Sequence, residues 1–307
     1  EYDGHNQNWQ GVQDQRGVLY VGNTHGVLEY DGTSWSRVTT GIDLARSLAV
    51  DSLGRIFVGA RDEIGYLRPD AGGQLGYHSL VSKLPESHRG FEDVWTTFAL
   101  KDGVYFHSSQ QIARWSGREG MQVWTTSGRY HRVFSVAGRF FVREEGIGLL
   151  EVRGKRLALV NGGEQFADVK VDAMMAIQGK FLLLTRTNGF VEWDPRSGAT
   201  TRWETEIDAH LQAYRVYTVK RVAEKGRESV FAITTFGGGV VLMDERGRHL
   251  ETLSEAAGIH TGALVLDVHP DAQGGLWFAL DNGLTRVATP TPVSWLGQEN
   301  GLEGLIE

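Results

Sequence analysis

The sequence predicts an all-β protein, a seven-bladed β-propeller built from four-stranded antiparallel blades. The 307 residues include 40 glycines but only six prolines, which indicates many tight turns between short strands. Apolar and β-branched runs of about four to six residues, too short for helices, separate these turns. A glycine-centred pattern also recurs seven times at a spacing of about 43 residues, which is typical of one propeller blade.

The repeat is clearest near the two ends of the chain. Gly17-Val-Leu-Tyr-Val-Gly22 is followed by Gly26-Val-Leu-Glu-Tyr-Asp31, and Gly275-Leu-Trp-Phe-Ala-Leu280 is followed by Gly283-Leu284. The turn glycines of the seven copies are Gly17, Gly54, Gly103, Gly138, Gly179, Gly226 and Gly275. One domain covering 1–307 is therefore expected, with blades at 8–40, 44–82, 92–126, 129–162, 168–205, 214–254 and 262–298.

Each copy predicts the same four strands. An Asp/Gly turn joins the first strand to the second, and bulky second-strand residues should fill the layers between blades: Phe57, Phe106, Phe141, Phe181, Phe231 and Trp277. The fourth strand often carries an aromatic residue: Trp35, Tyr77, Trp124, Trp203 and Trp295. Only 207–212 and 253–258 have a helical tendency, and both fall where a loop is expected.

Composition narrows the function. The net charge is −7 and no run of Lys or Arg exceeds two residues, so the electrostatic footprint of a nucleic-acid-binding protein is missing. No apolar stretch approaches the roughly 20 residues of a membrane helix. The absence of cysteine excludes disulfides and thiolate chemistry, and it fits both cytoplasm and periplasm.

No motif points to catalysis. A Gly-x-Ser-x-Gly elbow, a His-x-x-x-His pair, a calcium loop and a Walker motif are all missing from the sequence. The acidic pairs Asp62-Glu63 and Glu144-Glu145 are interpreted as solvated turns. Phe236-Gly-Gly-Gly239 lies between two predicted strands and is interpreted as a tight turn, since a phosphate loop would lead into a helix. We expect no catalytic residue, no cofactor and no metal.

Propeller geometry predicts where a ligand would bind. The loops between second and third strands share one face with the loops that lead into each blade, and both surround the mouth of the central channel. The first set supplies Asn23, His25, Arg61, Glu63, Gln110, Arg143, Glu145, Asn188, Phe236 and Asn282. The second set supplies Trp9, Arg46, Trp95, Tyr130, His131, Tyr214 and Arg215. Aromatic faces beside planar polar groups suit a small polar or carbohydrate-like ligand, and arginine suits a carboxylate; alternatively, these residues only cap the channel and bind water.

The repeat pattern, with Gly-x-Leu-Trp/Tyr followed by Gly-Leu/Val and Tyr-Asp, resembles the two-component regulator propeller family. The resemblance covers the whole chain, although His107-Ser108, Val142-Arg143 and Ile233-Thr234 replace the Gly-Thr that usually follows the second strand. It implies a periplasmic sensor domain of a bacterial hybrid histidine kinase or diguanylate cyclase. The chain would then be part of a longer receptor, with further blades and a signalling domain as partners and with dimerisation in the whole receptor. The linker-like residues 297–304 would lead into another blade.

Two alternatives remain open at this point. A propeller can act as a protein-interaction scaffold, because the fold does not fix the function. Propellers also form lyases similar to streptogramin lyase, in which a histidine at the channel mouth acts, and His107 or His131 would fill that role here.

Overall fold

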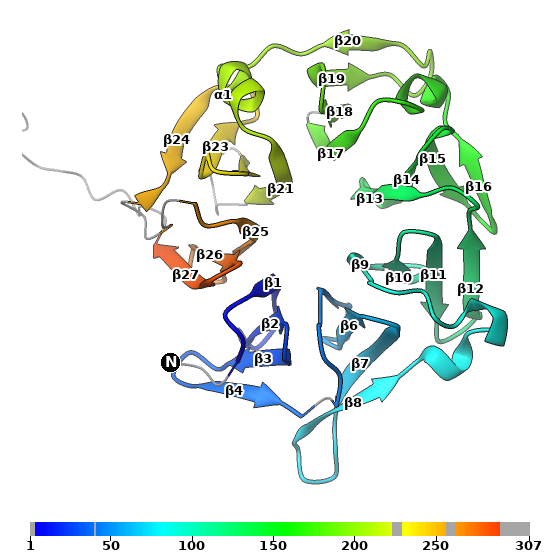
Figure 1. The fold of residues 1–307 in the computed structure, drawn as a ribbon, viewed down its shortest axis with the longest axis vertical. Helices are drawn as coiled ribbons and strands as arrows, with labels where there is room; N and C mark the ends of the chain where they lie inside the picture. The colour runs from blue at the N-terminus through cyan, green and yellow to red at the C-terminus, as the bar shows by residue number, and fades with distance from the viewer. Residues whose placement is uncertain are drawn as a thin grey trace, which may run out of the picture.

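The protein is a ring of seven antiparallel sheets arranged around a central axis (Figure 1). The computed structural model describes residues 4–39, 41–177, 179–222, 229–255, 259 and 262–288. The innermost strand of each sheet faces the axis, and the sheets follow one another in sequence order around it (Figure 1). The predicted seven-bladed propeller is therefore confirmed.

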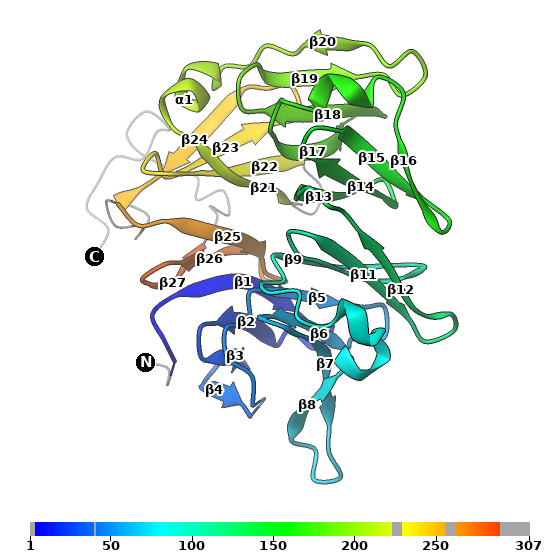
Figure 2. The same cartoon turned by 45° about the vertical axis from the view of Figure 1, so that its right-hand side comes forward.

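The first four blades each contain four strands. The strands of blades 1 and 2 are β1(Asn8–Gln13), β2(Leu19–Asn23), β3(Gly26–Tyr30), β4(Trp35–Val38), β5(Ser47–Val50), β6(Ile56–Ala60), β7(Glu63–Pro69) and β8(Leu75–Ser79). The strands of blades 3 and 4 are β9(Thr96–Leu100), β10(Gly103–His107), β11(Gln111–Ser116), β12(Gly120–Thr125), β13(Tyr130–Val136), β14(Arg139–Glu144), β15(Gly148–Arg153) and β16(Arg156–Leu159). The turn between β7 and β8 projects beyond the rim of the ring (Figure 2).

The last three blades continue this order. Their strands are β17(Val171–Ile177), β18(Lys180–Thr185), β19(Gly189–Trp193), β20(Thr200–Arg202), β21(Val216–Val222), β22(Val230–Thr235), β23(Val240–Asp244), β24(His249–Leu253), β25(Val265–Pro270), β26(Gly275–Leu280) and β27(Gly283–Ala288). Blade 7 thus has three strands in the described part of the chain. The expected turn glycine Gly226, the outer-strand Trp295 and the linker-like 297–304 lie outside the described residues.

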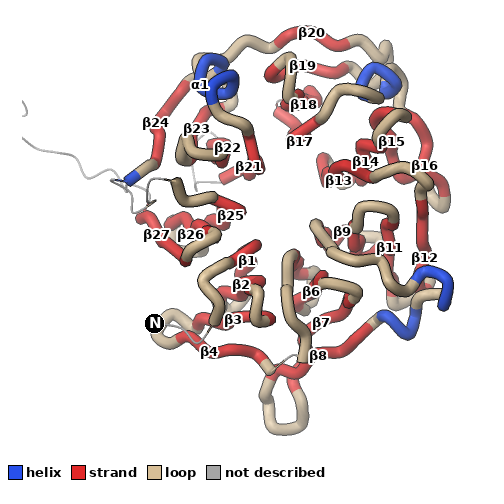
Figure 3. The backbone as a smooth tube through the Cα atoms, viewed as in Figure 1, coloured by secondary structure: helices blue, strands red, loops and turns tan. Residues whose placement is uncertain are grey.

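Among the described residues, helical structure lies in the loops at the periphery of the ring (Figure 3). In the described part of the chain, the short 3-10 helices are η1(Val81–Lys83), η2(Glu86–His88) and η3(Gly163–Phe166), and the α-helix is α1(Asp208–Ala213). The segment 207–212, which has a helical tendency but was expected to be a loop, therefore forms most of α1 between β20 and β21. Trp203, expected in a fourth strand, directly follows β20, and its N–H donates to Phe190 O at 3.0 Å.

Separate apolar clusters fill the seams between blades. The described core divides into seven clusters, and each one joins side chains of two neighbouring blades. Phe57 and Phe106 share the seam between blades 2 and 3, with ring centroids 6.3 Å apart, as the second-strand aromatics predict. Each sheet is buried on both faces only because a neighbour lies on each side, so the ring folds as one unit.

Blades 1 and 7 close the ring through side chains. Asn8 Nδ2 donates to Gly283 O at 2.9 Å, and Gly11 N donates to Asp267 Oδ2 at 3.2 Å. At the opposite face, Ala272 N donates to Gln13 Oε1 at 2.8 Å. The seam between the two ends of the described chain is therefore fixed at both faces of the ring.

Candidate functional site

A cavity of about 880 Å³ lies along the ring axis and extends from the channel mouth, at Trp9 and Trp95, to the far ends of β13, β17 and β21. Its walls come from the first strands β1, β9, β13, β17, β21 and β25 and from the loops that lead into the blades. The volume falls within the range of about 300–1,000 Å³ typical of small-molecule sites.

The mouth is shaped by a repeated irregularity in the innermost strands. Five of them carry a β-bulge near the start, where two residues oppose one residue of the second strand. In blades 2 and 3 the same place belongs to Arg46 and Trp95, whose N–H groups donate to the carbonyls of Gly59 and His107. The residues at this bulge position, blade by blade, are Trp9, Arg46, Trp95, His131, Asp172, Tyr217 and Leu266. All seven line the cavity, so the repeat presents one chosen side chain per blade to the mouth.

Some of the predicted site residues line the cavity and others do not. From the second set, the cavity is lined by Trp9, Arg46, Trp95, Tyr130, His131 and Arg215, of which Trp9, Tyr130 and His131 lie in the innermost strands β1 and β13. From the first set, Glu145 also lines it. The predicted residues that do not line it are Asn23, His25, Arg61, Glu63, Gln110, Arg143, Asn188, Tyr214, Phe236 and Asn282. The starts of the innermost strands and the residues just before them therefore line the mouth, and ligand contact by any of these residues stays a prediction.

Asn23 has a structural role that the sequence did not reveal. It is completely buried, and its Nδ2 donates to Asn8 Oδ1 at 2.8 Å and to the carbonyls of His5 and Gln7. Its Oδ1 accepts from the N–H groups of His5 and His25. The side chain is fully used in tying the N-terminal segment to blade 1, which leaves it no surface for a ligand.

Arg143 is also structural. The side chain is 2% exposed, and its Nε and Nη2 donate to the carbonyls of Phe166 and Ala167 at the end of η3. Its Nη1 lies 3.6 Å from Glu145 Oε1. Arg143 therefore fixes the loop between blades 4 and 5 from behind the cavity wall.

Four other predicted residues outside the cavity have local partners. Glu63 accepts hydrogen bonds from Tyr77 Oη and Ser79 Oγ within blade 2, and Arg61 Nε lies 3.2 Å from Asp93 Oδ1. The Tyr214 ring packs against His210 with centroids 4.8 Å apart. Phe236 lies under Arg215, whose Cζ is 4.0 Å from the ring centroid. The rest of the set, His25, Gln110, Asn188 and Asn282, is exposed.

On the side of blades 1–3, the bulge residues bind one another. Arg46 Cζ lies 4.0 Å from the Trp9 ring centroid and 4.5 Å from the Trp95 ring centroid. Arg46 Nε is also 3.1 Å from Asp93 Oδ1, although Nε and Nη1 make no hydrogen bond with the described residues. We call Trp9, Arg46 and Trp95 the closed wall, because the one positive charge there is covered by two indole faces and balanced by a carboxylate.

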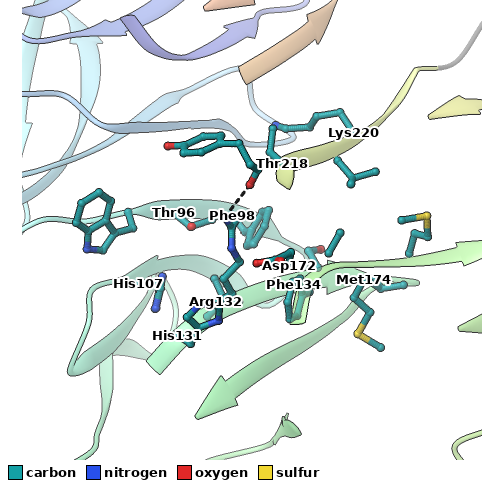
Figure 4. A pocket seen from close by; sticks show the side chains of 18 of the residues that line it. Thr96, Phe98, His107, His131, Arg132, Phe134, Asp172, Met174, Thr218 and Lys220 are labelled. Atoms are coloured by element: carbon teal, nitrogen blue, oxygen red, sulfur yellow. Dashed lines mark hydrogen bonds between the residues drawn. The ribbon is translucent and has the colours of Figure 1, made fainter. Parts of the chain in front are cut away.

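On the side of blades 4–6, the dominant side chain is Arg132. It extends from β13 across the cavity, and its Nη2 donates to Tyr217 O of β21 at 2.7 Å (Figure 4). Burial lowers the pKa of Arg132 below its ordinary value. Sequence reasoning missed Arg132, because it lies inside a predicted strand.

Two buried carboxylates in the cavity wall are already paired. Asp172 accepts two hydrogen bonds from Arg186, at 2.6 and 3.1 Å. Asp267 lies 3.1 Å from Lys220 Nζ, while burial raises the pKa of this carboxyl. Both acids therefore pair with neighbouring cations, and the charge of Asp172 also offsets part of the effect of burial on the pKa of Arg132.

Two histidines lie beside Arg132 (Figure 4). His107 is buried, its Nε2 is 3.2 Å from Tyr130 O, and burial lowers its pKa to about 4. Burial also lowers the pKa of His131 to about 3, and the next causes are the positive charges of Arg132, Arg143, Lys170 and Arg186. Both imidazoles are therefore neutral near pH 7 and are weak bases.

A second cavity of about 530 Å³ adjoins the first between blades 5 and 6. Three residues line both cavities: Asp172, Arg186 and Arg215. Within the described ranges, no three His, Asp or Glu side chains gather as they would around a metal ion. No helix in those ranges has the length and apolar character that crossing a membrane requires.

Comparison with known proteins identifies the architecture. No protein-family model and no curated protein matches the sequence. The structure is similar to the extracellular domain of a protein described as the hybrid two component system BT4673 from B. thetaiotaomicron, with a TM-score of 0.68 and 13% identity. The match covers 94% of this chain and 38% of the other, so the chain spans less than half of that extracellular domain. This neighbour fits the resemblance to the regulator-propeller family.

Propellers of other functions match as well. The WD40 beta propeller domain of Doa1 gives a TM-score of 0.68 at 13% identity, covering 95% of this chain and 96% of that domain. Virginiamycin B lyase from Staphylococcus aureus gives 0.66 at 10% identity, covering 94% and 97%. At such identities the likeness shows the fold, and the function has to be argued from the site.

Proposed function

We propose that this chain is the ligand-binding propeller of an extracytoplasmic bacterial sensor and that the ligand binds at the channel mouth. The observation that carries the proposal is the mouth cavity of about 880 Å³, to which every blade contributes its bulge-position side chain. A rigid ring in which each of seven blades contributes a different side chain to one cavity is suited to recognising a small polar molecule.

The comparisons support the location and the signalling context. The match to the extracellular domain of a hybrid two component system covers almost all of this chain and 38% of that domain. The proposed receptor would accordingly contain further blades and a signalling domain in the same protein, and any kinase or cyclase activity would lie in that domain.

The geometry favours binding over a lyase reaction. A lyase would need a base at the mouth, and the two candidates are His107 and His131. The low pKa of each histidine makes it a weak base, and the cations around His131 disfavour its protonation further. In the described part of the chain, no carboxylate hydrogen-bonds to either ring to strengthen it as a base.

A thermal-shift screen of the chain against oligosaccharides, amino acids and short peptides tests the proposal. A cognate ligand should raise the melting temperature by mass action. Trp95→Ala should abolish this response, since Trp95 lies in the cavity wall with 43% of its surface exposed. Leu159→Ala is the matched control, because Leu159 is equally exposed on the outer strand β16.

Two outcomes would contradict a small-molecule sensor. One is a ligand response that survives Trp95→Ala but is lost in Leu159→Ala. The other is silence across the panels together with stoichiometric binding of a folded protein partner, which would indicate a scaffold.

A further inference from the structure

The charge of the mouth is opposite to that of the whole protein. The chain carries a net charge of −7, yet the residues that line the cavity include eight Arg or Lys and only three Asp or Glu. Four of these cations have an ion-pair partner: Arg46 with Asp93 at 3.1 Å, Arg186 with Asp172 at 2.6 Å, Lys220 with Asp267 at 3.1 Å and Arg221 with Glu245 at 3.9 Å. Asp93 is shared with Arg61, which lies outside the cavity. The other four, Arg129, Arg132, Lys170 and Arg215, have no carboxylate oxygen within 4.0 Å among the described residues.

Three of the four unneutralised cations occupy one repeated position. Arg129, Lys170 and Arg215 each stand two residues before the bulge residue of their blade and immediately before its first strand. Blades 4, 5 and 6 are consecutive around the ring, so these three cations form an arc along one side of the mouth. Arg132 reaches across the cavity from β13 of blade 4 to Tyr217 O of blade 6, within the same three blades. We call Arg129, Arg132, Lys170 and Arg215 the cationic wall.

The pKa shifts of neighbouring groups reflect the closeness of these charges. Burial lowers the pKa of Arg132, Asp172 raises it in part, and the charges of Arg186 and Arg215 lower it further. His107 is affected by Arg132 and Arg129, and His131 by Arg132 and Lys170. A desolvated guanidinium without a carboxylate partner within 4.0 Å is costly, so the placement of Arg132 is not explained by stability.

We propose that the cationic wall binds the anionic group of a small organic ligand, a carboxylate or a sulfate or phosphate ester. The proposal rests on ligand binding at the channel mouth, the proposed function, and specifies its ligand class. Arg132 is held in place by Tyr217 O, so little ordering is needed when an anion arrives. Guanidinium groups match such oxyanions through charge-assisted hydrogen bonds, and neutral His131 adds a polar contact without adding charge.

The test compares ligands that differ in one charged group. Isothermal titration of the chain at low ionic strength would use glucuronate against glucose, with citrate and inorganic sulfate as further anions. We expect glucuronate or another anion to bind and glucose to bind at least tenfold more weakly. Whether a carboxylate or a tetrahedral oxyanion is preferred follows from the order of glucuronate, citrate and sulfate.

Variants locate the binding. Arg132→Gln should weaken anion binding about tenfold, and so should the double variant Arg129→Gln/Lys170→Gln, whose side chains are exposed and whose loss leaves the core intact. Lys180→Gln removes one positive charge from β18 in blade 5, outside the cavity, and should leave the affinity unchanged.

Three results would overturn the inference: silence of every anion, equal binding of glucuronate and glucose, or equal losses in Lys180→Gln and the wall variants. Failure here is separable from failure of the proposed function. A neutral ligand that binds and responds to Trp95→Ala would leave the mouth as a ligand site and remove only its anion selectivity.

Discussion

The two sides of the channel mouth use the same backbone position in opposite ways. In the closed wall, Arg46 is stacked on Trp9 and Trp95 and faces Asp93, so its interactions are internal. In blades 4–6 the corresponding residues are His131, Asp172 and Tyr217, next to cations that lack carboxylate partners in the described chain. The repeated bulge determines where a side chain points, and the residue placed there determines whether a cation is bound within the wall, as Arg46 is, or stays without a carboxylate partner.

The largest difference in stability is expected between two loops that join second and third strands, one in blade 1 and one in blade 5. Asn23→Ala removes the buried amide that makes five hydrogen bonds in blade 1 and should lower the free energy of unfolding by about 3 kcal/mol. Asn188→Ala, an exposed position in the corresponding loop of blade 5, should change it by less than about 0.5 kcal/mol. Urea denaturation of both variants measures the difference. Equal losses would show that the loops of the two sides are equally structural.

The buried histidine of blade 3 should make stability depend on pH. The pKa of His107 is about 4 in the folded protein, below the ordinary value of about 6.5, so the unfolded chain binds the proton more tightly. Its contribution is therefore present above about pH 6.5 and is lost as the pH falls toward 4, at most about 3 kcal/mol. His107→Gln should flatten the fall in unfolding free energy between pH 7 and pH 4.5, measured by urea denaturation. Parallel curves for the two proteins would contradict this assignment.

Arg46 and Arg132 should differ in how much each contributes to stability. Arg46→Met removes two cation–π contacts and an ion pair and should cost about 2 kcal/mol. Arg132→Met replaces a desolvated charge by an apolar chain and should change stability by less than about 1 kcal/mol, because only one hydrogen bond to a carbonyl is lost. Thermal and urea denaturation compare the pair. A larger loss of stability in Arg132→Met would show that Arg132 mainly holds blades 4 and 6 together.

The sequence predicted the ring more completely than the mouth. Turn glycines such as Gly17 and Gly54 recur because an Asp/Gly turn needs a positive φ, here 85° and 77°, and this requirement is visible as spacing. The loops that lead into the blades could be located from the same spacing. Tyr217 could not be found in this way, because a bulge depends on the register between two strands, and Arg132 could not because it lies inside a strand, paired with Arg143.

Asn23 and Lys170 show two other limits of the sequence. Asn23 looked like a mouth residue by its loop position, but its partners come from the segment before blade 1, which carries no repeat signal. Lys170 belongs to a repeated row with Arg129 and Arg215 that becomes visible only when the blades are aligned on their bulges. The repeat therefore predicts the scaffold, whereas the candidate site depends on side chains that differ from blade to blade.

The smallest expected effect tests whether the contrast between the two sides is electrostatic. Asp172→Asn leaves Arg186 without its carboxylate and should add its charge to the cationic wall. Affinity for glucuronate or citrate should then rise about threefold, as expected for one additional charge several ångströms away in a solvated cavity. Glu192→Gln is the matched control, because it frees Lys180 of the same blade outside the cavity and should not change anion affinity. An affinity that falls in Asp172→Asn would mean that Asp172 orients the site through Arg186, and the geometry of that pair, not the net charge, would then set the affinity of the mouth.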